Sequence, residues 1–201
     1  MNKLTLQNIR HAFENAILLG KGTNGIAFKI VIGNKEYVLK LTSSFSEYQI
    51  ALKIKKLQQE NSKVKEISAL VYLGGLISKL NIEINELSYK WFIITEYLEV
   101  NNKTKKYSEN NLYGKLFKIC IKIKTTISNL LNFDLNRLKT FWKTYYDKND
   151  NFAEFLLVIN ILKLHKTLKS NDFHSGNIGK DKNGNYKAFD FDMAWNRKFK
   201  L

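Results

Sequence analysis

Three polar residues near the end of the sequence have side chains suited to metal binding and proton transfer. Asp172 and Asn177 lie in "NDFHSGNIG", and Asp190 follows in "AFDFD". Mg²⁺ prefers oxygen ligands and shares its coordination with substrate phosphates, so one amide and one carboxylate on neighbouring loops suit it. Asn177 and Asp190 are therefore candidate metal ligands, and Asp172 could orient and deprotonate a hydroxyl group. A polar turn with an Asx cap would contain the same residue types.

A glycine-rich stretch lies much earlier, in "GKGTNGIAF", where Gly20, Gly22 and Gly25 precede Ala27. A dinucleotide-binding fold needs such a motif to open a helix, whereas this one leads into the strand-like "IAFKIVI". Glycines between two strands form a flap whose backbone can approach phosphates closely. An ordinary hairpin turn is the competing interpretation.

A lysine in the next predicted strand is the third candidate. Lys40 lies in the apolar "YVLKLT", and it can point inward only if its charge is paired or bound to phosphate. A solvated, outward-facing lysine is the alternative. Glu47, on the following helix, is the preferred partner, and Glu60 and Glu66 are its rivals.

The elements that position these residues follow from periodicity and turn signals. The spacing predicts a helix that begins near Leu4 and includes Ile17, and then a hairpin of "GIAFKIVI" and "EYVLKLT" around Gly33. A helix over "SFSEYQIALKIKKLQQE" follows, capped by Ser44 or Ser46. The β-branched and aromatic stretches "ISALVYLGGLI" and "YKWFIITEYLEV" predict two further strands.

The composition changes at residue 101. Residues 101–111 are polar and indicate a linker or exposed loop. Residues 112–132 and 152–168 have helical periodicity, and Asn183-Gly184 signals a hairpin turn near the end. The sequence therefore divides into a strand-rich half, 1–100, and a mostly helical half, 101–201.

The order of these motifs resembles the signature set of the protein-kinase-like superfamily, from about Leu18 to Asp192. The motifs come in the following order: a glycine-rich flap, a strand lysine, a helix glutamate, two strands, a helix, a D-x-x-x-x-N loop, a hairpin and D-F-x. "NDFHSGNIG" with "AFDFD" is similar to the loops of atypical kinases, including aminoglycoside and choline phosphotransferase-like proteins and RIO-type kinases. It also resembles "DLHSGN" of small phage-encoded Ser/Thr kinases.

The resemblance implies an α+β, minimal bilobal protein-kinase-like fold with ATP and Mg²⁺ as cofactors. Residues 1–100 would form an antiparallel-sheet N-lobe, and residues 101–201 a reduced, mostly helical C-lobe. By the same resemblance, Asp172 is the catalytic base, Lys40 held by Glu47 contacts the phosphates, and Asn177 and Asp190 hold Mg²⁺. The cofactor-binding positions are Gly20, Gly22, Gly25, Ala27, Lys40 and the main chain of Glu96 and Leu98, with Thr95 in the gatekeeper place of "TEYLE".

The chain departs from the family pattern around the predicted catalytic loop. Ser170-Asn171 replaces the usual His-Arg, so we expect no switching by activation-loop phosphorylation. Asp192 replaces the glycine of D-F-G, which argues against a D-F-G flip. Nine residues follow Asp192, without an A-P-E segment, so the large helical substrate-binding subdomain of ordinary kinases is expected to be missing.

Composition sets the remaining expectations. The 201 residues carry a net charge of +15 and are 44% hydrophobic, which suits one domain with a real core and acidic or ribonucleoprotein partners. The single Cys120 and the lack of a long apolar run predict a cytoplasmic protein, in the host cytoplasm if it is viral, with no membrane contact. We expect a compact Ser/Thr protein kinase with an acceptor protein, and dimerisation is one way in which so short a chain could complete itself. A small-molecule kinase of the aminoglycoside or choline type, and a pseudokinase that binds a partner or nucleic acid, are the alternatives.

Overall fold

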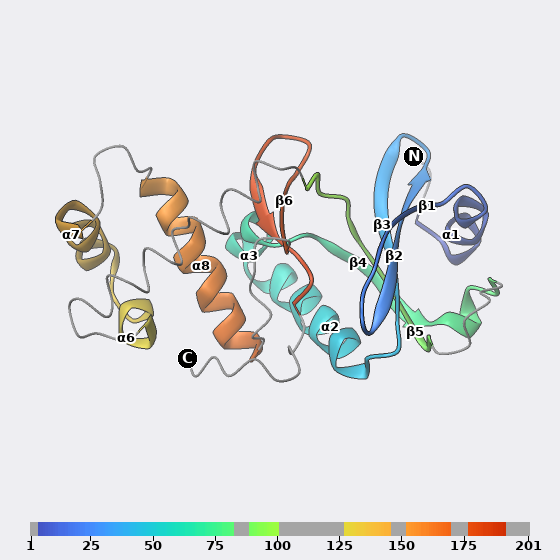
Figure 1. Cartoon of the computed structure of the whole chain (residues 1–201), viewed down its shortest axis with the longest axis horizontal. Coiled ribbons are helices and arrows are strands. Elements are labelled where there is room, and N and C mark those ends of the chain that lie inside the picture. Colours follow the sequence, from blue (N-terminus) through green and yellow to red (C-terminus); the bar gives the residue numbers. More distant parts are fainter. Residues whose placement is uncertain (1–3, 83–88, 101–126, 146–151, 170–176, 192–201) are drawn as a thin grey trace.

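The structure is a computed structural model that describes residues 4–82, 89–100, 127–145, 152–169 and 177–191. It is a mixed α+β arrangement (Figure 1). The helices are α1 (Leu6–Phe13), α2 (Phe45–Glu60), α3 (Ser62–Ile67), α6 (Ile127–Leu131), α7 (Leu135–Tyr145) and α8 (Phe152–Leu168), with a 3-10 turn η1 at Ile77–Lys79. The strands are β1 (Ile17–Lys21), β2 (Gly25–Ile32), β3 (Lys35–Thr42), β4 (Val71–Leu76), β5 (Trp91–Glu96), β6 (Ile178–Lys180) and β7 (Tyr186–Ala188).

A five-stranded antiparallel sheet in the order β1-β2-β3-β5-β4 forms one end of the molecule. The hairpin of β2 and β3 turns at Gly33, which has a φ of 62°, a value that glycine adopts without a steric penalty. Strand β3 lies between β2 and β5, so Lys40 has Ala27 beside it on one neighbour and Ile93 on the other. Helices α6 and α7 lie at the opposite end, and α8 lies between them and the sheet (Figure 1).

Helix α2 begins where a serine side chain can satisfy its first backbone donors. Ser44 Oγ accepts a hydrogen bond from the backbone N–H of Glu47 at 3.2 Å, so Ser44, rather than Ser46, is the N-cap. The helix ends at Glu60, and Asn61 caps the next helix by accepting from the N–H of Lys63 at 3.0 Å. This capping places Glu47 in the first turn of α2, on its buried side.

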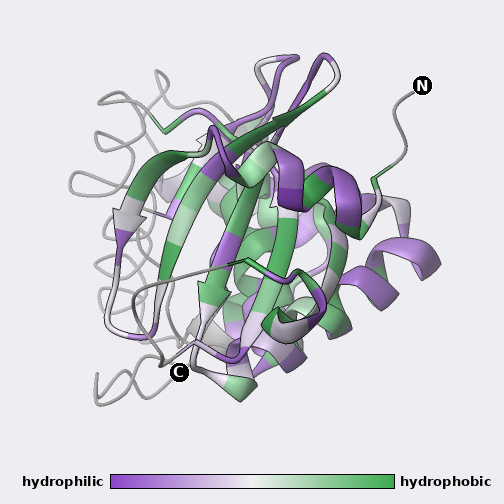
Figure 2. Ribbon diagram, turned by 90° about the vertical axis from the view of Figure 1, so that its right-hand side faces the viewer, coloured by the Kyte–Doolittle hydropathy of each residue, from purple (hydrophilic) through white to green (hydrophobic). Residues whose placement is uncertain are grey.

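Apolar side chains form clusters on both sides of α8. The strands are mostly apolar along their length, whereas polar residues gather on turns and helix surfaces (Figure 2). Ile161 and Leu164 of α8 pack with Ile50 and Ile54 of α2, and Phe155 packs into a separate cluster with α6 and α7. Each buried aliphatic side chain contributes about 1.5–3 kcal/mol. Helix α8 thus joins the α6–α7 pair to the layer that carries α2.

The predicted helix over residues 4–17 was too long, because Ile17 belongs to β1, where it pairs with Lys29 and is exposed. The strand predicted over "ISALVYLGGLI" begins only at Val71. Its first residue, Ile67, ends α3, a helix that the sequence patterns did not predict. Helix α7 lies within residues 112–150, where the sequence predicted helices without giving bounds for this one. The predicted linker 101–111, Cys120 and most of the predicted helix 112–132 lie outside the described residues. Among the residues with described structure, no helix combines the length and apolar character needed to cross a membrane.

Candidate active site

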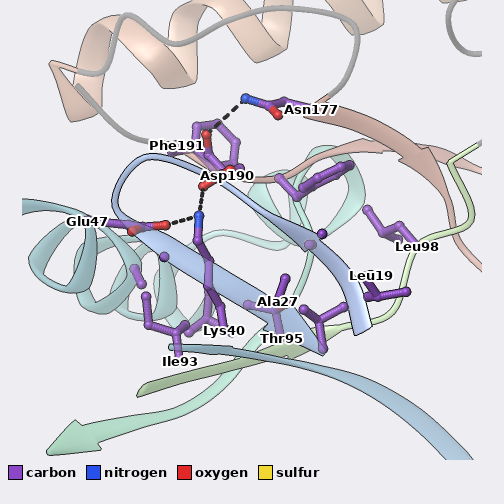
Figure 3. Close-up of a pocket in the computed structure, with 18 of the residues that line it drawn as sticks. Leu19, Ala27, Lys40, Glu47, Ile93, Thr95, Leu98, Asn177, Asp190 and Phe191 are labelled. Atoms are coloured by element: carbon purple, nitrogen blue, oxygen red, sulfur yellow. Dashed lines mark hydrogen bonds and ion pairs between the residues drawn. The ribbon is translucent and has the colours of Figure 1, made fainter. Parts of the chain in front are cut away.

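A cleft of about 1150 Å³ opens between the sheet and the two segments that follow β5 and β7. Figure 3 shows Lys40, Glu47 and Asp190 pointing toward one another at one end, and Leu19 and Leu98 at the other end. This volume exceeds the roughly 300–1,000 Å³ of typical small-molecule sites, so the cleft has room for a nucleotide. One end is charged and the other is mostly apolar.

The charged end is built around Lys40. Its Nζ contacts Glu47 Oε1 and Asp190 Oδ1, so one ammonium group is shared by two carboxylates. The Glu47 side chain is 5% exposed, whereas those of Lys40 and Asp190 are 22% and 32% exposed. Glu47 therefore anchors the lysine from the interior, and Asp190 faces the open cleft. Lys40 therefore pairs with Glu47, the partner that the sequence favoured over Glu60 and Glu66.

Burial and neighbouring charges together set the pKa values of Glu47 and Lys40. Loss of solvent is the largest effect on Glu47 and raises its pKa to about 7 against the opposing charge of Lys40, while the charge of Asp190 raises it further. Burial alone would lower the pKa of Lys40, but the carboxylates of Asp190 and Glu47 outweigh it and raise this pKa. Lys40 is therefore charged at neutral pH. With both carboxylates ionised, the group holds excess negative charge, which favours a cation nearby.

The backbone around Asp190 is held in an uncommon conformation. Asp190 has a φ of 56°, in the left-handed region that costs a non-glycine residue on the order of 1 kcal/mol. Asn177 Nδ2 donates to the carbonyl oxygen of Asp190 at 3.3 Å, and Phe189 N donates to the carbonyl oxygen of Asn177 at 2.9 Å. The buried ring of Phe191 lies 4.6 Å from that of His165. These contacts hold the Asp190 carboxylate beside Lys40, and local strain of this kind is typical of functional sites.

The glycines of the flap have different structural roles. A Cβ atom at Gly25 would lie 2.5 Å from the carbonyl oxygen of Leu41, so the β2–β3 pairing itself requires glycine there. A Cβ at Gly20 would meet no heavy atom within 4 Å, and one at Gly22 would meet only the carbonyl oxygen of Gly25 at 3.9 Å. Both residues line the cleft. Packing therefore does not explain Gly20 and Gly22, and their missing side chains leave space for a ligand.

The apolar end of the cleft receives the segment that leaves β5. Thr95, Glu96 and Leu98 line it, and Ala27 lines it from β2. The Glu96 N–H donates to the carbonyl oxygen of Leu70 at 2.8 Å, which binds this segment to the start of β4. Apolar side chains beside main-chain polar groups are typical of a site for a flat heterocycle.

The structure brings nearly all of the predicted site residues to this one cleft. The lining includes Gly20, Gly22, Gly25, Ala27, Lys40, Glu47, Glu96, Leu98, Asn177 and Asp190. Asp172, the predicted base, lies outside the described residues. Sequence reasoning missed Ala51, Ile54 and Val71, which line the inner wall. Only the helical spacing of Ala51 and Ile54 with Glu47 could have indicated that these residues share its face of α2.

Oxygen ligands for a metal are few in the described part of the chain. No group of three or more His, Cys, Asp or Glu side chains comes together there. Asn177 and Asp190 supply one amide oxygen and one carboxylate. Such a pair fits Mg²⁺, which binds few protein groups and keeps water and phosphate oxygens as its other ligands.

Comparison with known proteins does not assign the chain to a family. A scan against models of protein families found no match, and a search of curated proteins found no similar sequence.

Proposed function

We propose that this chain is an ATP-dependent phosphotransferase, a compact protein kinase that transfers the γ-phosphate of ATP to a Ser or Thr hydroxyl of an acceptor protein. The observation that carries the proposal is Lys40, which lies between the buried Glu47 and the cleft-facing Asp190. In this interpretation the sheet and α2 form the N-lobe of a bilobal kinase-like fold. Helices α6–α8 with the β6–β7 hairpin form its C-lobe.

Phosphoryl transfer depends on positioning and charge neutralisation more than on covalent catalysis. Lys40, kept in place by Glu47, would contact the α- and β-phosphates, and the open backbone at Gly20 and Gly22 would cover them. Asn177 and Asp190 would hold Mg²⁺, which neutralises charge on the phosphate oxygens when it is bound.

The transfer itself moves one phosphoryl group and one proton. The acceptor hydroxyl oxygen bonds to the γ-phosphorus as the bond from that phosphorus to the β–γ bridging oxygen breaks, and ADP leaves. By the resemblance of its loop, Asp172 would accept the hydroxyl proton. The apolar walls beside Leu98 would bind the adenine ring.

The alternatives receive less support from the cleft. A partner-binding pseudokinase does not need a buried glutamate to hold a lysine against a second carboxylate, because that arrangement costs stability without adding surface for a partner. An acidic pocket for a cationic small molecule would have to form from residues 101–150, most of which lie outside the described residues. The alternatives are therefore outcomes that the following test can reveal.

The decisive experiment measures transfer of labelled γ-phosphate from Mg-ATP. Wild type, Lys40→Met, Asp190→Ala and the control Lys35→Met are compared, with the protein itself, a generic basic protein and a cell extract as acceptors. Lys35 is an exposed residue of the same strand as Lys40 and lies outside the cleft lining. We expect wild type and Lys35→Met to label a protein, and the two cleft variants to lose on the order of 100-fold in rate or more.

The other outcomes are equally informative. Equal labelling by Lys40→Met would refute the proposed role of the cleft. No labelled protein, together with Mg-ATP binding, would favour a small-molecule acceptor. If the protein neither labels an acceptor nor binds nucleotide, the result would favour a pseudokinase that binds a partner or nucleic acid.

A further inference from the structure

A second group of charges, largely buried, links the end of β5 to the β6–β7 hairpin beside the cleft. Lys187 Nζ in β7 lies 2.9 and 3.1 Å from the carboxylate oxygens of Glu96, at the end of β5, and 3.4 Å from Asp181 Oδ2. Lys187 and Asp181 are 7% and 8% exposed. Lys187 does not line the cleft, whereas Glu96 does. The lysine can therefore affect a ligand only through its neighbours.

The carboxylates of Asp181 and Glu96 also accept hydrogen bonds from backbone N–H groups. Asp181 Oδ1 accepts from the backbone N–H groups of Asn183 and Asn185, each at 2.9 Å, and Glu96 Oε2 accepts from Leu70 N at 3.1 Å. Burial alone would raise the pKa of Asp181, but the hydrogen bonds from Asn185 and Asn183 and the charge of Lys187 lower it. The Asp181 carboxylate is therefore ionised at neutral pH, and the hydrogen bonds fix the group to the start of β4, to β5 and to the β6–β7 turn.

A backbone link lies beside these charges. Glu99 N donates to the carbonyl oxygen of Lys180 at 2.8 Å, and Lys180 N donates back to that of Glu99 at 2.9 Å. A Cβ at Gly179 would lie 2.7 Å from Leu98 Cβ, so β6 passes very close to the segment after β5. The hairpin thus contacts the base-binding segment through both its side chains and its main chain.

The same hairpin carries the two candidate metal ligands at its ends. Asn177 immediately precedes β6, and Asp190 follows β7 by two residues. Any shift of the hairpin against β5 would therefore move both ligands relative to Glu96 and Leu98. The buried ion group opposes that shift, since separating its members would leave charges buried without partners.

We propose that Lys187 is a positioning residue that holds the base-binding segment 96–98 in register with Asn177 and Asp190, so that a nucleotide engages both ends of the cleft at once. This role rests on the function proposed above. Adenosine would use only the base-binding end, and Mg-pyrophosphate only the metal end. Mg-ADP spans both, and the affinity gained by joining two ligand parts depends on the relative placement of their sites.

The test compares the affinities of these three ligands, measured by isothermal titration calorimetry. The variants are Lys187→Met, the double variant Asp181→Asn with Lys187→Met, Lys187→Arg, and the control Lys182→Met. Lys182 is an exposed lysine of the same hairpin. In the double variant, asparagine replaces Asp181, the more buried of the two carboxylates that Lys187→Met leaves without the lysine, because the side chain of Asp181 is 5% exposed and that of Glu96 is 17% exposed. This variant provides a folded protein if the single variant is too unstable.

We expect both variants that lack the lysine to bind Mg-ADP about tenfold more weakly, within the range of coupling between two sites. Their affinities for adenosine and for Mg-pyrophosphate should stay within about twofold of wild type, because each of these ligands uses only one end of the cleft. Lys187→Arg, which keeps the charge, should retain most of the Mg-ADP affinity, and Lys182→Met should match wild type.

A merely structural role would weaken the binding of all three ligands alike, and that result would overturn the proposal. Unchanged Mg-ADP affinity in the variants without the lysine would overturn it as well. A folded wild-type protein that bound none of the three ligands would instead refute the proposed function, and the role of Lys187 with it.

Discussion

Glu47→Gln tests whether burial of the Glu47 carboxylate raises its pKa and thereby makes the stability of the protein depend on pH. Burial raises the pKa of Glu47 from 4.5 to about 7 in the folded protein. The folded state then binds this proton more tightly than the unfolded state does, so the stabilisation is complete below pH 4.5 and is lost as the pH rises through 7. Glutamine has nearly the same shape and no such proton. The variant should therefore lack this part of the pH dependence.

The magnitude follows from the shift in pKa. A change from 4.5 to about 7 corresponds to roughly 3 kcal/mol, at 1.36 kcal/mol per pKa unit. About 2 kcal/mol of this accumulates between pH 5.5 and pH 8. We expect the free energy of unfolding of wild type to fall by about 2 kcal/mol more than that of Glu47→Gln across this interval.

The assay is urea unfolding followed by tryptophan fluorescence at pH 5.5 and pH 8, with a chelator present so that no divalent cation binds. Glu60→Gln is the matched control, because Glu60 lies on the same helix in an exposed pair with Lys56 at 3.8 Å. This control should keep the wild-type pH dependence. Parallel losses of stability in wild type and Glu47→Gln would refute the assignment of the raised pKa to Glu47.

Further predictions concern the flap, the metal ligands and the helix cap. Gly25→Ala should destabilise the protein by about 1–3 kcal/mol in urea unfolding, because its Cβ would overlap a backbone carbonyl of β3, whereas Gly22→Ala should leave the unfolding midpoint unchanged. Asp190→Asn should abolish the dependence of ADP affinity on Mg²⁺, measured by titration with and without a chelator, and an unchanged dependence would exclude Asp190 as a ligand. Ser44→Ala should cost about 1 kcal/mol in urea unfolding by removing the cap of α2, and no change in stability would contradict that role.

The elements with strong local signals could be predicted from the sequence. Strands β2 and β3 alternate around Gly33, and the hairpin near the end has its turn at Asn183-Gly184. The pairing of Lys40 with Glu47 was predictable because a cap at Ser44 places Glu47 in the first turn of α2, next to the strand that carries the lysine.

Other features depend on contacts that no local pattern encodes. Ile17 continues a helical period, yet its pairing with Lys29 draws it into an exposed edge strand. The contact of Lys40 with Asp190 spans 150 residues, and that of Lys187 with Glu96 spans 91. In a chain so rich in lysine, nothing in the sequence distinguishes Lys187 from a solvated lysine. Its burial follows from the way in which the hairpin packs against β5.

The separation between Lys40 and Asp190 also has a consequence for synthesis of the protein. At roughly 5–20 residues per second, the 150 residues between them take about 8–30 s to translate. Strands β1–β5 can pair during this time, but Ile50 and Ile54 of α2 must wait for Ile161 of α8 to cover them. A growing chain thus exposes an apolar helix face beside a finished sheet, which is the kind of surface that chaperones bind. We therefore expect folding on the ribosome to proceed in two stages, with the sheet first and the cleft only after the β6–β7 hairpin has emerged.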